Sequence, residues 1–533
     1  MKLNLKSISA DGELAKAGIK VPEFDVSAVQ ERARKEPRWI HLGPGNIFRI
    51  FLARIADDAL AAGDYWPITG VVPMDPKEQD LQLTPFDNLT LGVILNPDGS
   101  RDERVIAGMA ESLSWQREAD WERLTKLMAD PSVTLMTFTV TEKGYSIQDS
   151  HGNVTDAVKD AFNGDPYARN ANTMVSVAAL LAHRYREGAA PITLLSTDNF
   201  SHNGDKLRDS ILTVATGWVE AGKMEQGFAD WVSDSSKVAF PISVIDKITP
   251  RPSEEVSEAL ATAGFEDMGI DHVGRTPVAG FVNSEPTEYL IVEDNFAADR
   301  PKLENYGVII TDRETCDAFE SMKVSSCLNP LHTALAISGV LLHFPTIDSE
   351  MRDADLSALV HRLGWKETLP VATNPGIVKP EDFLGEVLEQ RFPNRYLPDS
   401  PARIAMDTSQ KLPIRYGVPV KEHIKRGTDL DSLVAIPLVF ALWARYLMQV
   451  DDEGKEFEPS SDPLYDELHE YVKDIKLGED TDVHAHLQPI FSNAAIFGVD
   501  LYTTPLGAKA EALFSRLIAG PGAIRTTIHE EIN

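Results

Sequence analysis

The stretch from Arg38 to Leu60, RWIHLGPGNIFRIFLARIADDAL, constrains the fold more than any other part of the chain. It begins with a short apolar segment that ends in Gly43-Pro44-Gly45, and apolar residues then recur at the spacing of one helical face. A strand, a glycine turn and a helix in this order are the setting of a dinucleotide-binding fingerprint, in which glycines let backbone N–H groups approach a pyrophosphate. Phe48 occupies the third glycine position, so the match to G-x-G-x-x-G is partial, and an ordinary turn before a helix is the competing interpretation.

Strand and helix patterns alternate from this turn to about residue 300. Near-continuous apolar strands such as 191–196 are separated by helical segments such as 171–188 and 204–221, a pattern typical of a parallel sheet that is covered on both faces. The segment 89–108 predicts a β-hairpin around an Asn-Pro-Asp-Gly turn, inserted in the parallel sheet. We therefore expect residues 1–300 to form an α/β, Rossmann-like dinucleotide-binding domain.

The second half of the chain has mostly helical patterns. They cover residues 313–323, 331–344, 349–364, 380–391, 400–406, 429–449, 462–476 and 506–519. This succession predicts a mainly α-helical domain over residues 301–533. Because no long linker separates the halves, we expect them to pack together, with the active site in the cleft between them.

The overall charge and the few cysteines limit the possible partners and compartment. With 82 acidic and 51 basic residues the net charge is −31, which argues against nucleic acid and anionic membranes as partners, and an anionic substrate would need a locally basic pocket. Cys316 and Cys327 imply no disulfide framework and fit a reducing cytoplasm. The N-terminus has no signal-peptide pattern, and the most apolar run, 433–444, is too short to span a bilayer. His484 and His486 have no third ligand at a suitable spacing, so no metal site is expected.

The segment 319–344, FESMKVSSCLNPLHTALAISGVLLHF, carries the residues best suited to chemistry. Lys323 has apolar and small neighbours, and desolvation lowers the pKa of a lysine until it can act as a general acid or base near neutral pH. Asn329 can donate a hydrogen bond to an oxygen that gains charge, and His332, three residues on, can orient a hydroxyl. The competing interpretation is a lysine that reaches water beside an ordinary Asn-Pro helix start. The three side chains suit the conversion of an alcohol to a carbonyl beside a hydride acceptor.

Further candidate residues follow predicted strands or carry positive charge. Asn199 lies in STDNFSHNG at a strand end, where open α/β sheets bind ligands, and is a second candidate hydrogen-bond donor to a substrate oxygen. Asp75 is the nearest acid after the second strand and could accept the ribose hydroxyls of NAD, while Lys77 beside it leaves NADP open. Arg403 and Lys411 supply the local positive charge that a sugar-acid carboxylate would need.

Eight short stretches extend this picture from about residue 39 to residue 413. They are HLGPGNIFR, TEKGY, STDNFSHNG, IDKITP, VEDNFAADRP, FESMK, LNPLHTALA and RIAMDTSQKLP. In these stretches and in their order the chain resembles the mannitol dehydrogenase family of long-chain polyol and sugar-acid dehydrogenases. The resemblance implies a metal-independent NAD(P) oxidoreductase with an N-terminal Rossmann-like domain and a helical C-terminal domain.

The resemblance also implies roles for individual residues. Lys323 would be the catalytic acid or base, Asn199 and Asn329 would polarise the substrate oxygen, and His332 would help to bind the substrate. Arg403 and Lys411 would hold the far end of the substrate, and Glu320 matches an acidic position near the family's lysine. The cofactor would contact the residues of the glycine turn, the second strand end and TEKGY, namely Gly43, Gly45, Asn46, Asp75, Thr141 and Glu142.

One departure from the family pattern concerns the spacing between Lys323 and Asn329. The family has four residues there, whereas this chain has five, VSSCL. On a continuous α-helix one extra residue would turn the lysine by about 100° away from its partners. Because Pro330 cannot donate to the carbonyl four residues back, we hypothesise that a break or a π-bulge absorbs the extra residue there.

The leading expectation is reversible hydride transfer between NAD(H) and the C5 position of D-fructuronate and D-mannonate. The mannitol/fructose and tagaturonate/altronate pairs stay open, since polyol enzymes of the family can share Arg403 and Lys411. A non-catalytic nucleotide-binding protein on the same fold is the alternative from another class, and the joint presence of Lys323, Asn199 and Asn329 speaks against it. We expect a cytoplasmic monomer or small homo-oligomer that acts on a small sugar acid or polyol.

Overall fold

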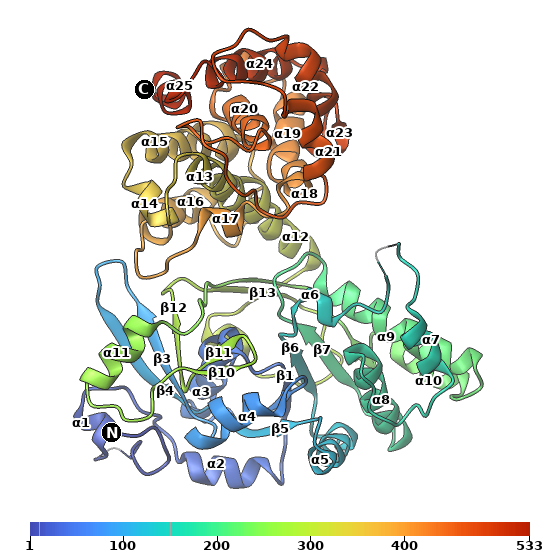
Figure 1. Cartoon of the computed structure of the whole chain (residues 1–533). Coiled ribbons are helices and arrows are strands. Elements are labelled where there is room, and N and C mark those ends of the chain that lie inside the picture. Colours follow the sequence, from blue (N-terminus) through green and yellow to red (C-terminus); the bar gives the residue numbers. More distant parts are fainter. Residues whose placement is uncertain (10, 150) are drawn as a thin grey trace. The chain divides into compact units, whose positions relative to one another are not determined.

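The computed structural model describes residues 1–9, 11–149 and 151–533, and the chain divides into two compact units. They are Met1–Cys316 and Asp317–Asn533, whereas the sequence analysis set the boundary between residues 300 and 301. The first unit is α/β and the second is helical (Figure 1). This confirms the fold class expected from the sequence.

A six-stranded sheet forms the centre of the first unit, with the order β5-β2-β1-β6-β7-β8 and parallel pairing throughout. Its strands are β1 (Trp39–Leu42), β2 (Ile68–Val72), β5 (Met109–Ser114), β6 (Leu135–Phe138), β7 (Ile192–Ser196) and β8 (Val238–Ala239). Numbered along the chain within this sheet, the order is 3-2-1-4-5-6, the doubly wound order of dinucleotide-binding domains. The order reverses between β1 and β6, and ligands of such sheets bind beyond the carboxyl ends of the strands at this point.

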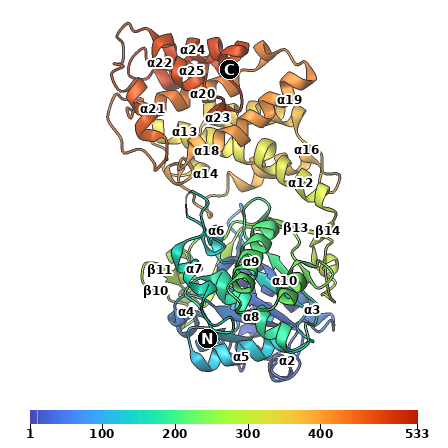
Figure 2. The ribbon, with the colours of Figure 1, turned by 90° about the vertical axis from the view of Figure 1, so that its right-hand side faces the viewer.

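Both faces of the parallel sheet are covered, as the apolar strand sequences predict. On one face, Ile40 and Phe138 join a core with the helices α5, α8, α9 and α10, which are labelled in Figure 2. On the other face, Trp39 and Leu135 join a second core with α3 (Ala53–Ala61). The first set of helices comprises α5 (Glu118–Ala129), α8 (Thr173–Arg186), α9 (Asn203–Glu220) and α10 (Gln226–Ser233). The strands can therefore be apolar along their whole length.

The predicted hairpin forms, but its expected insertion in the parallel sheet was wrong. β3 (Thr90–Leu95) and β4 (Arg101–Ile106) pair antiparallel, and β3 pairs on its other edge with β12 (Phe281–Ser284). The resulting three-stranded sheet is separate from the parallel one, because β12, from far along the chain, takes the free edge of β3. The other small sheets contain β9 (Ser243–Asp246), β13 (Tyr289–Glu293) and β14 (Ile309–Thr311), and β10 (Asp271–Val273) with β11 (Thr276–Val278). The remaining helices of this unit are α1 (Glu13–Lys16), α2 (Val26–Ala33), α4 (Pro76–Gln82), α6 (Thr141–Gly144), α7 (Asp156–Phe162) and α11 (Glu254–Thr262).

The second unit is built around α13 (Asn329–Leu341) and α20 (Ala435–Leu447), and every residue of α20 is buried. The expected helix 349–364 is two helices, α14 (Ile347–Met351) and α15 (Ala354–Arg362), because the Asp353 carboxylate accepts the N–H groups of Asp355 and Leu356 and starts a new helix. Helices that matched expected ranges are α16 (Pro380–Glu386), α17 (Pro401–Ile404), α21 (Tyr465–Val472) and α24 (Pro505–Leu517). Helices not expected are α18 (Thr408–Leu412), α19 (Val418–Arg426), α22 (Val483–Phe491), α23 (Ala494–Phe497) and α25 (Ala523–Ile532).

One helical run, Arg313–Leu341, is long and apolar enough to cross a membrane by length and composition. It includes α12 (Arg313–Met322) and α13, and 78% of its most apolar window is buried inside the protein. Burial of this kind is typical of a core helix.

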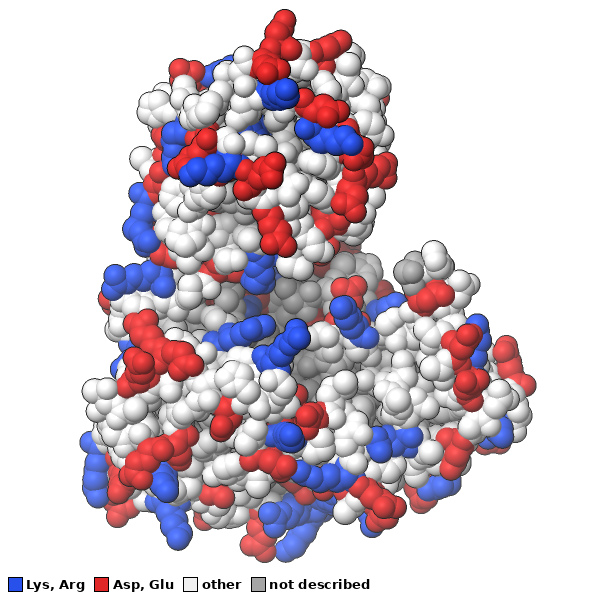
Figure 3. Space-filling model, viewed as in Figure 1, with Lys and Arg blue, Asp and Glu red and all other residues white. Residues whose placement is uncertain are grey.

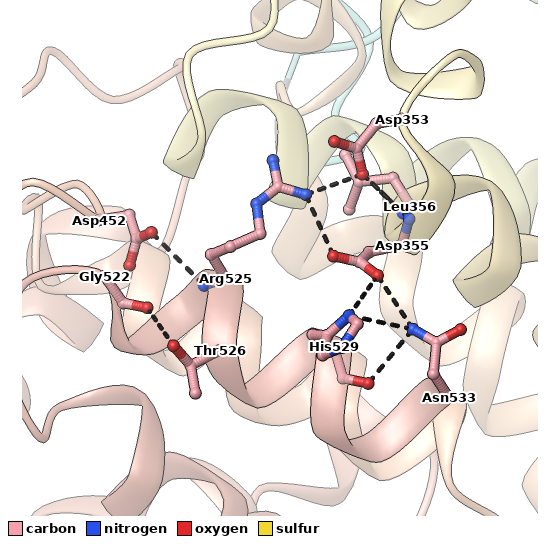
Figure 4. A network of polar contacts seen from close by, with 9 residues as sticks. All are labelled: Asp353, Asp355, Leu356, Asp452, Gly522, Arg525, Thr526, His529 and Asn533. Atoms are coloured by element: carbon pink, nitrogen blue, oxygen red, sulfur yellow. Dashed lines mark hydrogen bonds and ion pairs between the residues drawn. The ribbon is translucent and has the colours of Figure 1, made fainter.

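The C-terminal helix α25 is attached to α15 by a polar network (Figure 4). Nη1 of Arg525 donates to Oδ1 of Asp353 at 2.7 Å, and Asp355 accepts from Asn533 at 2.9 Å and lies 2.8 Å from Nδ1 of His529. The carboxylate of Asp452 also accepts the N–H of Ile524 at the start of α25. These bonds hold the end of the chain against the rest of the unit.

The start of α20 is satisfied by a buried carboxylate from another segment. Glu367 is 1% exposed, and its two oxygens accept the N–H groups of Val434, Ala435 and Ile436 at 2.8–2.9 Å. The first N–H groups of a helix have no partner within the helix, and a negative charge there also interacts favourably with the helix dipole. Glu367 thus fixes the most deeply buried helix of the second unit.

We predict that Glu367→Gln lowers the free energy of unfolding by about 2 kcal/mol, because the amide replaces one acceptor oxygen by a donor that faces backbone N–H groups. Urea and thermal unfolding would measure the change. Glu381→Gln, on the exposed first turn of α16, is the matched control, with an expected effect below about 0.5 kcal/mol. Equal stability of the two variants would show that the Glu367 cap is not needed.

Candidate active site

A pocket of about 510 Å³ lies at the carboxyl ends of the strands where the sheet order reverses. Its walls come from the loops after β1, β2 and β6 and from the start of α8, and they include Gly43, Gly45, Pro73, Thr139 and Thr173. This is the place at which a doubly wound sheet binds a dinucleotide.

The two glycines of the first turn have different functions. Gly43 has a φ of +90°, and a Cβ there would lie 2.2 Å from the carbonyl oxygen of Thr139, so only glycine fits. A Cβ on Gly45 would meet only the carbonyl oxygen of Gly43, at 4.0 Å, and Gly45 lines the pocket. The space that a side chain at Gly45 would fill therefore suits the pyrophosphate of a dinucleotide, whose close approach requires a bare backbone.

Phe48 explains how the turn does without its third glycine. Its ring stacks on the His41 ring with centroids 3.8 Å apart and planes inclined by 14°, and it begins a π-helix, Phe48–Leu52. The ring nitrogens of His41 lie 2.7 Å from Oγ1 of Thr137 and 2.9 Å from Oγ1 of Thr139. Burial lowers the pKa of His41 to about 3, so a neutral imidazole supports the glycine turn.

The loop that contains Thr141 is held by Asp198, a residue that the sequence analysis did not single out. The Asp198 carboxylate accepts the N–H groups of Val140 and Thr141 at 2.8 and 3.0 Å and the hydroxyl of Tyr145 at 2.6 Å. Burial raises the pKa of Asp198, and these three hydrogen bonds oppose that shift. Thr141 has a φ of +64°, so the carboxylate stabilises a strained backbone at the edge of the pocket.

Three of the residues expected to contact the cofactor, Gly43, Gly45 and Thr141, line the pocket. The side chain of Asn46 is instead bonded within the protein: its oxygen accepts from Nη2 of Arg49 at 2.9 Å, and its amide donates to the carbonyl of Pro250 at 3.4 Å. Its contact with a cofactor stays a prediction.

Asp75 and Glu142 are close to the pocket without lining it. Asp75 caps α4 by accepting the N–H of Lys77 at 2.9 Å, and Glu142 is exposed. Glu78, on the first turn of α4, does line the pocket, and burial, with the Asp75 charge as a second cause, raises its pKa. Glu78 could not be found from a motif, because nothing in its local sequence marks it.

The start of α8 also contributes to the pocket wall. Asn172 caps this helix by accepting the N–H groups of Met174 and Val175 at 2.9 and 3.2 Å, and its own amide donates to the carbonyl of Ser146. An Asn before an apolar helical pattern is a helix-start signal, so the cap was readable from the sequence although its place at the pocket was not.

Asn199 follows β7, at the same carboxyl edge of the sheet as the pocket, and is exposed within the first unit. The segment that carries it is fixed on both sides. Asp198 holds the preceding residue, and the buried Asn203 donates to the carbonyl of Asp198 at 2.9 Å and accepts the N–H of Ser243 at 3.0 Å. The position expected for a substrate-binding amide is therefore well defined.

In the second unit, Lys323 is 3% exposed and begins a π-helix, Lys323–Cys327. The N–H of Leu328 donates to the carbonyl of Lys323 at 3.1 Å, five residues back, which is the wider turn expected where one extra residue must be absorbed. Pro330 leaves the carbonyl of Ser326 without a helical donor, and the hydroxyl of Thr368 donates to it at 2.7 Å. The hypothesised π-bulge is thus present between Lys323 and Asn329.

His332, on α13, has charged neighbours of both signs. Its ring stacks on Phe392 with centroids 5.0 Å apart, and its Nε2 is 3.8 Å from an oxygen of Asp399. Burial lowers its pKa to about 3; Asp399 opposes this, while Arg415, Arg403 and Arg391 add to it. His332 is therefore neutral near pH 7 and can orient a hydroxyl without carrying charge.

The residues expected to bind the far end of a substrate have partners of their own. Arg403 donates through Nε to Asp399 at 2.7 Å and forms a second bond from its guanidinium to the other carboxylate oxygen. Nζ of Lys411 donates to the carbonyls of Ile404 and Met406, and burial lowers its pKa to about 8. Asp399, a partner of both Arg403 and His332, was missed because nothing in its local sequence marks it.

Together these residues define a basic cluster in the second unit. We give this name to Lys411 and to the three arginines whose charges act on His332 or on Lys411, namely Arg391, Arg403 and Arg415. A neutral histidine, a buried lysine and a cationic wall suit an uncharged carbonyl on a molecule that also carries negative charge. No group of three or more possible metal ligands occurs among the residues with described positions.

Two family models match the chain. The model of the mannitol dehydrogenase Rossmann domain matches residues 37–305, and the model of the mannitol dehydrogenase C-terminal domain matches residues 315–509. The chain is 44% identical to the D-mannonate oxidoreductase of Thermotoga maritima over 100% of this chain and 99% of that protein. It is 31% identical to the mannitol 2-dehydrogenase of Cereibacter sphaeroides over 84% of this chain and 88% of that protein.

Two solved structures share the fold over the whole chain. The crystal structure of D-sorbitol dehydrogenase in substrate-free form has a TM-score of 0.81 and 24% identity, and covers 100% of both chains. The ternary complex of Pseudomonas fluorescens mannitol 2-dehydrogenase with NAD and D-mannitol has a TM-score of 0.73 and 24% identity, and covers 99% of both. At this identity the likeness concerns the fold.

We predict that Gly45→Ala weakens NAD binding by about tenfold or more, because the added methyl group occupies the open space of the pocket, and tenfold corresponds to about 1.4 kcal/mol. Titration of NADH fluorescence would measure the affinity. The melting temperature should stay unchanged, since a Cβ at Gly45 meets no protein atom closer than 4.0 Å. Gly43→Ala is the contrasting variant: its Cβ would clash with Thr139, so it should lower stability as well. Unchanged NAD affinity in Gly45→Ala would place the pyrophosphate elsewhere.

Proposed function

Because the chain belongs to the mannitol dehydrogenase family, we propose that it is an NAD-dependent oxidoreductase that interconverts D-fructuronate and D-mannonate. The observation that carries the choice of substrate is the 44% identity to a D-mannonate oxidoreductase over the full chain. The basic cluster supports the same choice, because a sugar acid carries a carboxylate and a polyol does not.

The cofactor is NAD, held in the first unit at the pocket beyond β1 and β6. When bound, it accepts a hydride from the alcohol carbon or returns one to the carbonyl carbon. Gly45 leaves room for the pyrophosphate, and Asp198 holds the Thr141 loop beside it. Asp75 would bind the ribose hydroxyls, and Asn46 and Glu142 are further candidate contacts. NADP remains an outcome of the test below.

Lys323 is the general acid of the reduction and the general base of the oxidation. As C5 of fructuronate gains a hydride, its oxygen takes a proton from the Lys323 ammonium, and the neutral amine regains a proton from solvent. In the reverse direction the neutral amine removes the hydroxyl proton. The side chain is 3% exposed in its own unit, and removal of water from an ammonium favours proton release.

Three neutral side chains complete the proposed reaction site. Asn329 and Asn199 donate hydrogen bonds to the oxygen that gains charge, and His332 orients a substrate hydroxyl. Because the pKa of His332 is lowered to about 3, its ring stays neutral through the pH range in which a lysine base is useful. Glu320, three residues before Lys323, is a further candidate for a role beside the lysine.

The basic cluster would bind the end of the substrate that carries the carboxylate. The chain as a whole has a net charge of −31, and acidic and basic side chains are interspersed over the faces of both units in Figure 3. The basic cluster, with three arginines whose charges act on one neutral histidine, therefore differs from the average surface, and local positive charge is what an anionic ligand of an acidic protein requires. Arg403 and Lys411 would act here together with Arg391 and Arg415.

The setting proposed for this activity is the cytoplasm. Cys316 and Cys327 are both buried and neither forms a disulfide, which fits a reducing compartment. A small sugar acid would be the only partner that the reaction needs, with neither nucleic acid nor membrane involved, and the protein would act as a monomer or small homo-oligomer.

A panel of substrates tests the proposal. D-mannonate, D-altronate, D-mannitol and D-arabinitol are each supplied with NAD or NADP, and the formation of reduced nicotinamide is followed by its absorbance. We expect the highest kcat/KM for D-mannonate with NAD. A preference for D-mannitol or D-altronate would assign the chain to another activity of the family, and no turnover of any alcohol would favour a nucleotide-binding protein without catalysis.

We predict that Lys323→Ala lowers kcat by about 10²- to 10⁴-fold, the usual contribution of a positioned acid or base, while the affinity for NAD is unchanged. Lys323→Arg should be equally inactive, because a guanidinium keeps its proton. Lys366→Ala, at an exposed position of the same unit, is the matched control with wild-type kcat. A kcat near the wild-type value in Lys323→Ala would exclude the proposed proton transfer.

A further inference from the structure

Arg415 differs from Arg403 in having no acidic partner. It lies in the π-helix Pro413–Gly417, and its Nη1 donates to the neutral hydroxyl of Thr333 at 2.5 Å. Among the residues that the structure describes, no carboxylate lies within ion-pair distance of it, although the chain has 82 acidic residues. Burial lowers the pKa of Arg415 to about 10, and the neighbouring Tyr416 opposes this shift. A partly desolvated guanidinium without a counter-ion is unfavourable unless a ligand supplies one.

Arg403, the cation that the sequence favoured for this purpose, is already neutralised. Asp399 accepts two hydrogen bonds from it in the fork arrangement, and the Arg403 side chain is 68% exposed. A guanidinium held in this way has little charge left for a second carboxylate. Lys411 directs its ammonium at the carbonyls of Ile404 and Met406, which already take two of its three donors.

The position of Arg415 is fixed relative to Asn329 and His332, the residues of α13 proposed to contact the reacting part of the substrate. Its neighbour Tyr416 donates through its hydroxyl to the carbonyl of Pro330 at 2.6 Å, one residue from Asn329. Thr333, which holds the Arg415 guanidinium, follows His332 on α13. A Cβ on Gly417 would lie 2.6 Å from the carbonyl of Phe497, so the backbone of this π-helix cannot shift outward. The guanidinium is therefore held at a set place along a substrate that reacts beside Asn329.

We propose that Arg415 is the counter-ion of the substrate carboxylate and the residue that makes the site prefer a sugar acid to a polyol. The proposal rests on the proposed function and deepens it. A guanidinium binds a carboxylate through two parallel charge-assisted hydrogen bonds, and among the described residues only Thr333 accepts a hydrogen bond from Arg415, through Nη1, which leaves Nη2 and Nε for the carboxylate. The carboxylate lies at the opposite end of the carbon chain from the reacting C5, so Arg415 binds the ground state and the transition state alike.

A matched pair of substrates isolates this contact. D-mannitol is D-mannonate with the carboxylate replaced by a hydroxymethyl group, and its carbon chain otherwise has the same configuration. The two compounds therefore share every contact with Lys323, Asn329 and His332 and differ in the contact with Arg415.

The experiment compares the wild type with Arg415→Gln, Arg415→Lys and Arg403→Gln, with both substrates and NAD. For Arg415→Gln we expect KM for D-mannonate to rise about 30- to 100-fold with kcat within about threefold, because the lost contact binds the ground state and the transition state equally. For D-mannitol, which has no carboxylate, kcat/KM should change less than about threefold. Arg415→Lys keeps the charge and should recover part of the affinity for D-mannonate. Arg403→Gln removes a residue of the binding site and should lower kcat/KM for both substrates alike, so that the D-mannonate to D-mannitol ratio changes less than threefold, because Asp399 already neutralises the Arg403 charge.

The outcomes separate the inference from the proposed function. If the wild type oxidises D-mannonate but Arg415→Gln keeps the wild-type KM, or if Arg403→Gln loses more D-mannonate affinity than Arg415→Gln, Arg415 is not the counter-ion. A fall in kcat with both substrates would show that Arg415 only supports α13. If the wild type acts on D-mannitol and not on D-mannonate, the proposed function itself is wrong. If the wild type shows no measurable turnover of D-mannitol, the KM values of the wild type and the variants for D-mannonate still decide whether Arg415 is the counter-ion.

Discussion

The backbone around Lys323 in the second unit depends on one hydrogen bond, which the hydroxyl of Thr368 donates to the carbonyl of Ser326. Pro330 removes the N–H that would normally satisfy this carbonyl, and the Thr368 hydroxyl takes its place. The backbone can then widen to the π-helix Lys323–Cys327 without leaving a buried acceptor unpaired. Lys323 and Asn329 are six residues apart, and the π-turn between them accommodates the residue by which this chain departs from the family spacing.

Widened helical turns recur at the other functional positions. Phe48–Leu52 follows the glycine turn of the pocket, Pro413–Gly417 carries Arg415, and Val387–Arg391 ends in another cation of the basic cluster. A π-turn changes the direction of the side chains that follow it and interrupts the regular α-helical hydrogen bonds. Such turns are often found at functional sites. At Lys323–Cys327 a side chain from another segment compensates, because the Thr368 hydroxyl donates to the carbonyl of Ser326.

The sequence predicted the parts of this protein that are encoded locally. The Gly43-Pro44-Gly45 turn and the alternation of strands and helices gave the Rossmann-like unit, and the spacing of Lys323 and Asn329 gave a specific hypothesis of a π-bulge. Contacts between distant segments were not predictable. The pairing of β12 with β3, the Asp198 contacts and the Asp399–Arg403 ion pair all join segments whose local sequence gives no sign of the partner. The missed helix α25 is held by such contacts with α15 as well.

The distribution of charge explains why the sequence predicted the residues of the site more readily than the class of its substrate. The acidic excess of the chain hides a small group of cations, and counting residues cannot reveal which of them are already paired. In the structure, Asp399 satisfies Arg403 and leaves Arg415 with a hydroxyl as its partner. A site for an uncharged polyol would gain nothing from a guanidinium kept without a counter-ion, because desolvation of a charge is unfavourable. A carboxylate on the substrate provides the missing charge, so the unpaired arginine favours a sugar acid.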